Sequence, residues 1–172
     1  MKKQNTIQKE KLEHLFSSVV ASKEVKEITG LSYKQIKEWN KKSILPCRER
    51  DSDGARQWRR FSGSDVLKLC ILKELRDAGI PPLDLYELVL WLKDNEKDIL
   101  EEITKEITQG AKIYLSTNLK DEFYLVPDSQ KINHALFLAY NTRDADAKIC
   151  MRVNINQIVS DILKIINKES LE

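Results

Sequence analysis

The clearest pattern of apolar and polar positions lies in Ser22–Leu45 and predicts two short helices joined by a tight turn. Val25 and Ile28 are three residues apart in the first helix, a spacing that places both on one face. Ser22 is a suitable N-cap for this helix, and Gly30 permits the sharp turn that follows. Together the two segments are typical of a small helix-turn-helix unit.

The second helix of this unit is expected from Tyr33 to about Lys42, with Ser32 as its N-cap and Ile36 facing inward. One face carries three lysines at positions i, i+3 and i+7, namely Lys34, Lys37 and Lys41. A short helix that offers these cations and the indole of Trp39 fits the DNA major groove. The pattern therefore favours a DNA-binding function.

After the second helix, an arginine-rich segment surrounds the dipeptide Asp53-Gly54. This dipeptide is a strong signal for a two-residue hairpin, because both central positions of the turn need a positive φ. Trp58 and Phe61 interleave with the arginines on either side of the turn, which are Arg48, Arg50, Arg56, Arg59 and Arg60. We interpret the hairpin as a wing that holds DNA phosphates. An arginine-rich surface loop is the alternative.

Residues 1–20 are expected to form an arm with an amphipathic helix. Its apolar positions recur at a spacing of three to four residues: Leu12, Leu15, Phe16, Val19 and Val20. A partly frayed leader is one alternative, and an extended Val19–Ala21 is another. After the wing, Ser62 or Ser64 caps a helix that ends at Gly79, and Pro81-Pro82 opens the next helix.

A charged helix is predicted within residues 93–110, with a narrow apolar stripe made by Ile99, Leu100, Ile103 and Ile107. Such a stripe is typical of a coiled-coil seam, but this helix is too short to stand alone. A second copy of the helix would lengthen the seam, so the four residues are candidates for dimerisation. Packing against the C-terminal part of the same chain is the alternative.

Beyond Gly110 the apolar period shortens, and residues 111–172 are expected to form a small α/β module. It would hold strands at Lys112–Thr117, Glu122–Val126 and Lys148–Val153 and a final helix, whereas Ile132–Tyr140 fits either a helix or a strand. The expected fold is mostly α with small β (α+β). Its four parts are the arm (1–20), a winged helix-turn-helix domain (21–92), a dimerisation helix (93–110) and this module (111–172).

Composition sets the class of protein. The chain has 172 residues, of which 41% are apolar and 33% charged, as in a helix-rich globular protein with a real core. It has no apolar run long enough for a transmembrane helix, and its charged N-terminus lacks a signal-peptide core. Three scattered cysteines, Cys47, Cys70 and Cys150, suit a reducing compartment. We therefore expect a cytoplasmic protein without a membrane partner.

Charge divides the chain into two unlike halves. Residues 1–80 carry 18 Lys and Arg against 11 Asp and Glu, whereas residues 81–172 carry 11 against 16. A basic half joined to an acidic half suggests one part that binds nucleic acid and one that stays off the phosphates.

The sequence contains no motif of a catalytic or metal site. A Gly-rich phosphate loop, a G-x-S-x-G elbow and an H-E-x-x-H helix are all missing. His14 and His134 have no neighbouring Cys or His partner, and Asp144 and Asp146 lie in a polar stretch where acids are usually solvated. We expect no enzymatic activity, no cofactor and no metal.

These features together resemble the MerR family of bacterial transcription regulators. Four segments match the family's helix-turn-helix, recognition helix, wing and following helix end, in that order: Ser22–Ser32, Ile36–Ile44, Gln57–Val66 and Ala78–Ile80. The resemblance covers about residues 20–92. It departs from the family pattern at Lys37, Trp39 and Gln57, where arginine, tyrosine and glycine are usual. Gly110–Tyr114 is also similar to the first strand of a C-terminal module in one subgroup, whose ligand is not implied.

The resemblance implies a homodimer that binds a pseudo-palindromic promoter operator and bends or untwists double-stranded DNA for use by RNA polymerase. The candidate DNA-binding residues are Ser32, Tyr33, Lys34, Lys37, Trp39, Lys41, Arg56, Arg59 and Arg60. Tyr33, Lys34 and Lys37 are expected in the groove, and Trp39, Arg59 and Arg60 on the backbone. Trp39 and Trp58 have an alternative place in the core.

Two other functions fit parts of the pattern. An architectural DNA-bending protein of the excisionase type shares the winged fold, but such proteins seldom need a module like residues 111–172. A protein-interaction adaptor would have lost DNA binding. The seven Lys and Arg against three Asp and Glu in residues 41–60 speak against the adaptor.

Overall fold

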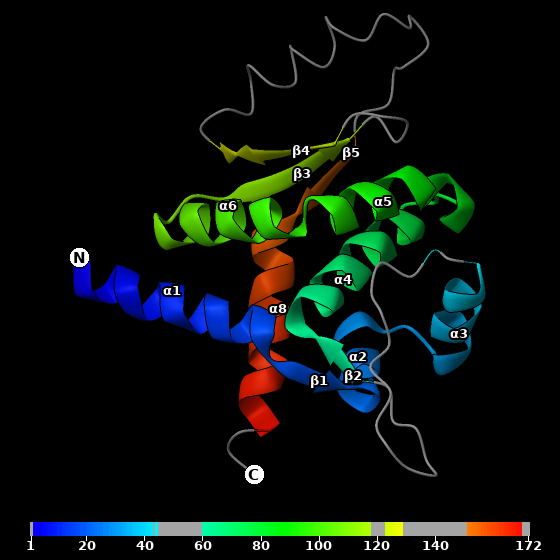
Figure 1. Cartoon of the computed structure of the whole chain (residues 1–172), viewed down its shortest axis with the longest axis horizontal. Helices are drawn as coiled ribbons and strands as arrows, with labels where there is room; N and C mark the ends of the chain where they lie inside the picture. Colours follow the sequence, from blue (N-terminus) through cyan, green and yellow to red (C-terminus); the bar gives the residue numbers. More distant parts are fainter. Residues whose placement is uncertain (1, 43, 45–59, 118–122, 129–150, 170–172) are drawn as a thin grey trace, which may run out of the picture.

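The computed structural model describes residues 2–42, 44, 60–117, 123–128 and 151–169 (Figure 1). The elements follow in the order α1 (Lys2–Ser17), β1 (Val19–Ala21), α2 (Ser22–Thr29), α3 (Tyr33–Lys41), β2 (Arg60–Ser62), α4 (Gly63–Asp77), η1 (Pro82–Leu85), α5 (Tyr86–Asp94), α6 (Glu96–Thr108), β3 (Ile113–Thr117), β4 (Phe123–Pro127), β5 (Met151–Asn154) and α8 (Ile155–Glu169). Helices dominate, and the strands form two small antiparallel sheets. The expected class, mostly α with small β, is confirmed.

Several predicted features lie outside the described residues. They are Asp53-Gly54 with its flanking Arg48, Arg50, Arg56, Trp58 and Arg59, then Ile132–Tyr140, Cys47, Cys150, His134, Asp144 and Asp146. Within the described ranges, no helix is both long and apolar enough to cross a membrane.

Strand β1 joins the N-terminal helix to the helix-turn-helix unit. It pairs antiparallel with β2, which places Val20 opposite Phe61 and Ala21 opposite Arg60. The side chains of Val20 and Phe61 are buried and tie this two-stranded sheet to the core. The predicted amphipathic helix is confirmed as α1, and the extended alternative for Val19–Ala21 is confirmed as β1.

Helix α4 starts in direct contact with the end of α1. A Cβ atom on Gly63 would lie 1.9 Å from the carbonyl oxygen of Leu15, so only glycine allows the two backbones to approach this closely. The Gly63 N–H also donates to the carbonyl of Ser18 at 3.0 Å. The buried side chains of Leu12, Leu15 and Phe16 complete the contact of α1 with the core.

Helix α4 is the central helix of the molecule and is capped by Ser62. The Ser62 Oγ accepts from the Asp65 N–H at 3.1 Å, and the Asp65 carboxylate accepts from the Ser62 N–H at 3.0 Å. Of the two serines considered as the cap, Ser62 is therefore the right one. Cys70 is buried in α4, and burial, with a smaller contribution from the Glu74 charge, raises its pKa to about 12. Its thiol is an apolar part of the core.

A buried polar cluster ties the first turn of α4 to the first residue of α6. Ser64 Oγ donates to Glu96 Oε1 at 2.6 Å, and Lys68 Nζ lies 3.0 Å from the same oxygen. Lys68 Nζ is also 3.4 Å from Asp65 Oδ1. Burial alone would raise the pKa of Glu96. The hydrogen bonds from Ser64 and Lys68, together with the charge of Lys68, outweigh this effect of burial and hold the pKa of Glu96 below its usual value. Glu96 is therefore a carboxylate at neutral pH.

The apolar stripe of α6 is covered by the same chain. Ile99, Ile103 and Ile107 are buried, and α6 contacts α1, α5, β3 and β4. The alternative of packing within the same chain fits this structure, because α1 and the C-terminal sheet occupy that face; the dimer seam stays a prediction. Leu100, the fourth residue of the stripe, is partly buried against the same cluster.

The C-terminal part of the chain packs onto the helix-turn-helix unit. Strands β3, β4 and β5 form a sheet in the order β4-β3-β5, and α8 runs from β5 past α4 and α2 (Figure 1). The Asn156 side chain accepts from the Ile113 N–H at 2.6 Å and donates to the Ala111 carbonyl at 3.1 Å, which fixes α8 to the start of β3. Ile158 and Ile162 of α8 belong to the same hydrophobic cluster as α2 and α4.

The contact at Gly63 predicts an unusually large cost for the smallest substitution. We expect Gly63→Ala to lower the free energy of unfolding by about 2 kcal/mol or more, because the new methyl group must push α1 away from α4. Gly79→Ala is the control: Gly79 has φ 96° but open space around it, so its cost is limited to backbone strain of about 1 kcal/mol. Urea unfolding measures both, and equal losses would contradict the close-approach argument.

Candidate nucleic-acid interface

The turn between α2 and α3 is built by local hydrogen bonds. Gly30 ends α2 with φ 65°, and its N–H donates to the Lys26 carbonyl at 2.8 Å. The Thr29 hydroxyl donates to the Val25 carbonyl at 2.6 Å and accepts from the Leu31 N–H at 3.1 Å. Leu31 is fully buried in the angle between the two helices. The predicted helix-turn-helix geometry is confirmed.

Of the two N-caps predicted for this unit, one is confirmed and the other is wrong. Ser32 caps α3 as expected, since its Oγ accepts from the Gln35 N–H at 3.3 Å and the Gln35 side chain accepts from the Ser32 N–H at 2.8 Å. Ser22 is not an N-cap: α2 begins at Ser22, Ala21 takes the cap position, and the Glu24 carboxylate accepts from the Ala21 N–H. An acidic side chain in the first turn replaces the expected serine.

Helix α3 has one buried face and one charged face. Ile36 and Trp39 are buried, so they fix the rotation of the helix against the core. Lys34, Lys37 and Lys41 are exposed on the remaining surface. In the part of the chain that the structure describes, none of these three lysines makes an ion pair. They are unpaired cations on a rigidly held helix, as a surface that binds phosphate requires.

Trp39 is a core residue and not a backbone contact. Its exposed fraction is 4%, and the Arg76 guanidinium carbon lies 5.8 Å from its ring centroid. The Trp39 carbonyl accepts from the Ile44 N–H at 2.9 Å. The prediction that Trp39 contacts the DNA backbone is therefore wrong, because the indole fills the space between α3 and α4.

Helix α4 supports the helix-turn-helix unit with a second contact. Asp77 accepts from Lys73 Nζ at 2.6 Å and from Arg76 at 2.9 Å. These hydrogen bonds lower the pKa of Asp77, and the one from Lys73 has the larger effect. The Lys73 Cε would lie 3.3 Å from a Cβ placed on Gly30. Asp77 thus holds one cation beside the turn and another over the indole. Sequence reasoning missed this support, although Lys73 and Asp77 stand at the i, i+4 spacing of a helical ion pair.

Strand β2 is the part of the predicted wing segment that the structure describes. Arg60 is exposed on β2, and the neighbouring Phe61 is buried, which is the alternation of a strand with one face on the core. Strand β2 contacts α2. The other two wing candidates, Arg56 and Arg59, lie outside the described residues. The structure thus gathers the three lysines and the 55%-exposed Tyr33 on α3, with Ser32 as its N-cap, and places Arg60 on a different element.

Among the described residues, no three His, Cys, Asp or Glu side chains lie close enough together to hold a metal ion.

Comparison with known proteins agrees with this geometry. Residues 20–89 match the family model described as the MerR HTH family regulatory protein. This stretch is a MerR-type helix-turn-helix domain. It begins at β1 and ends in α5, so it includes α2, α3, the wing strand β2 and α4. The resemblance seen in the sequence is confirmed for this domain.

Three curated relatives support the same conclusion at lower similarity. They carry the name uncharacterized HTH-type transcriptional regulator, and come from Mycobacterium bovis and from two strains of Mycobacterium tuberculosis. Each is 27% identical over 106 residues, which is 62% of this chain and 47% of the relative. The chain therefore spans about half the length of the curated relatives that it matches.

The burial of Trp39 predicts a stability effect that a DNA-contacting residue would not show. We expect Trp39→Ala to lower the free energy of unfolding by about 3 kcal/mol or more, because it leaves a cavity between α3 and α4. Lys41→Ala, two residues along the same helix and exposed, should change it by less than about 0.5 kcal/mol. Urea unfolding without DNA makes the comparison. A near-neutral Trp39→Ala would contradict the core assignment.

Proposed function

We propose that this chain is a sequence-specific DNA-binding transcription regulator, with α3 as its recognition helix. The observation that carries the proposal is the exposed face of α3 inside a MerR-type domain, on which Lys34, Lys37 and Lys41 make no ion pair with any other described residue. The names of the curated relatives, HTH-type transcriptional regulators, support the regulatory role.

Helix α3 and the arginine-bearing wing segment would contact different parts of the DNA. Helix α3 has nine residues and enters the major groove, where Tyr33, Lys34 and Lys37 reach base edges and Lys41 reaches a phosphate. Arg60, with Arg56 and Arg59, holds phosphates beside the groove. Ser32 contributes mainly by capping α3, because its hydroxyl is already engaged by Gln35.

We further propose that the regulator acts as a homodimer on a pseudo-palindromic promoter operator and bends or untwists the DNA, with RNA polymerase as a further partner. One copy presents one recognition helix, so a two-part operator needs two copies related by a twofold axis. The α6 isoleucines are buried within the chain, and α6 remains the helix predicted for the twofold contact.

The charged face of α3 predicts a selective loss of DNA binding. We expect Lys37→Ala and Lys34→Ala each to raise the Kd for DNA about tenfold, since each removes a hydrogen bond to a charged group. A lost phosphate contact should also reduce the slope of log Kd against log salt by about one unit. The measurement is a binding titration at several salt concentrations.

Lys164→Ala is the matched control for these variants. Lys164 is an exposed lysine of α8 that pairs with Asp161 at 2.7 Å, so the variant removes one positive charge away from α3. It should bind DNA like the wild type. If the two α3 variants also bind like the wild type while all three proteins stay folded, the assignment of α3 is wrong.

A further inference from the structure

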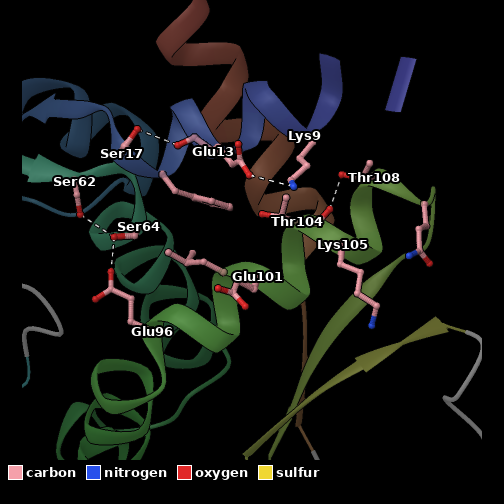
Figure 2. Close-up of a pocket in the computed structure, with 13 residues that line it drawn as sticks. Lys9, Glu13, Ser17, Ser62, Ser64, Glu96, Glu101, Thr104, Lys105 and Thr108 are labelled. Atoms are coloured by element: carbon pink, nitrogen blue, oxygen red, sulfur yellow. Dashed lines mark hydrogen bonds and ion pairs between the residues drawn. The ribbon is translucent and has the colours of Figure 1, made fainter. Parts of the chain in front are cut away.

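A pocket of about 970 Å³ lies between α1, α6 and the start of α4 (Figure 2). This volume is within the range of sites that bind small molecules. Eleven of its thirteen lining residues are polar, and the two apolar ones are Phe16 and Leu100. No residue of α3 lines the pocket, and the proposed DNA-binding role does not involve it.

One end of the pocket holds an oriented carboxylate. Glu96 Oε1 is engaged by Ser64 at 2.6 Å and by Lys68 at 3.0 Å, which fixes the carboxylate in place. Among the described residues, the other oxygen, Oε2, has no hydrogen-bond partner. The side chain is 40% exposed and lines the pocket, so Oε2 is an acceptor available to a bound molecule.

Two turns along α6 from Glu96, the pocket holds a buried hydroxyl that has no partner among the described residues. Thr104 has an exposed fraction of only 7% and lines the pocket. Its carbonyl accepts from the Thr108 hydroxyl at 2.6 Å, but within the described part of the chain the hydroxyl of Thr104 itself makes no hydrogen bond. A buried hydroxyl left unpaired costs free energy that a ligand can recover.

Three pocket residues stand in line along α6. Glu96, Leu100 and Thr104 follow at intervals of four residues, so they lie on neighbouring turns of one helical face. The eight residues that separate Glu96 from Thr104 correspond to about 12 Å along the helix axis. Leu100 lies between them, and Phe16 of α1 contributes the facing apolar surface.

The charges of the lining favour a cation over an anion. Lys9 is already 3.6 Å from Glu13, and Lys105 is 3.2 Å from Glu102 and 3.3 Å from Glu106. The lining holds three carboxylates against these two ammonium groups. Glu96 Oε2 and the Thr104 hydroxyl, two turns apart on one face of α6, are the two groups that we assign to ligand binding.

We propose that this pocket binds a small organic amine whose ammonium group donates to Glu96 and whose apolar body lies between Phe16 and Leu100. A hydroxyl or similar group at the far end of the ligand pairs with Thr104. A second copy of the chain fits less well, because the buried centre of a protein interface is depleted in charged groups.

The pocket is connected to the wing strand. Ser64, which holds Glu96, is also 2.8 Å from the Ser62 hydroxyl, and Ser62 is the last residue of β2. Its α1 wall continues through Ser18 into β1, the partner of β2. We therefore expect a bound amine to bias the position of the Arg60 strand and, with it, DNA affinity. This consequence rests on the proposed function, whereas amine binding itself does not.

The experiment is an amide NMR titration of the full chain with tyramine, which has an ammonium group and a phenol at opposite ends. Tyramine should shift the amides of Ser64, Glu96 and Thr104, and 4-hydroxyphenylacetate, its anionic counterpart, should bind at least about tenfold more weakly. Glu96→Gln should weaken tyramine binding about tenfold. Glu87→Gln, an exposed carboxylate of α5, should leave it unchanged.

A second variant keeps the test decisive if Glu96→Gln is poorly folded. Tyramine should bind more tightly than 2-phenylethylamine, and Thr104→Val should remove that difference, because only tyramine carries the group that pairs with Thr104. Equal binding of the amine and the anion, or an unchanged difference in Thr104→Val, overturns the proposal. So do pocket shifts that depend on protein concentration alone, which indicate a second copy. None of these readings needs DNA, so a failure of DNA binding is separately visible.

Discussion

The close approach of α1 and α4 at Gly63 is the constraint on which the other contacts depend. Because β1 directly follows α1 and β2 directly precedes α4, the contact with Leu15 brings these two strands side by side. Their pairing then joins the start of the helix-turn-helix unit to the end of the wing. The same approach lays α1 along α6 and so forms the wall of the pocket.

The proposed DNA-binding surface is supported by packing from both ends of the chain. Helix α2 packs on α4 and on the C-terminal helix α8, and α3 is held against α4 by Trp39 beneath Arg76. The lysines of α3 thus stand on a helix whose rotation is fixed by buried neighbours. A polar cluster centred on Glu96 connects this support to α6. The proposed amine site and the proposed DNA surface are therefore joined through contiguous packed elements, the kind of network that carries coupling between two sites.

Local chemistry made the helix-turn-helix predictable, whereas long-range packing did not follow from the sequence. Gly30 and Ser32 act through neighbours within four residues, so their spacing was enough to predict the turn and the cap of α3. The stripe of α6 was also predicted, but periodicity shows that a face is buried and not what covers it. The role of Trp39 was hard to predict for a related reason, because an indole suits both a core position and a DNA contact. The pocket needs α1, α4 and α6 together, so no local sequence pattern predicted it.

The most direct test of the central claim is selection of bound fragments from randomised double-stranded DNA by the purified full chain at near-physiological salt. The proposed regulator should enrich a defined consensus made of two inverted half-sites about one helical turn apart. It should lose that consensus in Lys37→Ala. Enrichment of bendable sequence without a motif would contradict sequence-specific regulation and indicate an architectural protein. No enrichment at all would contradict DNA binding itself.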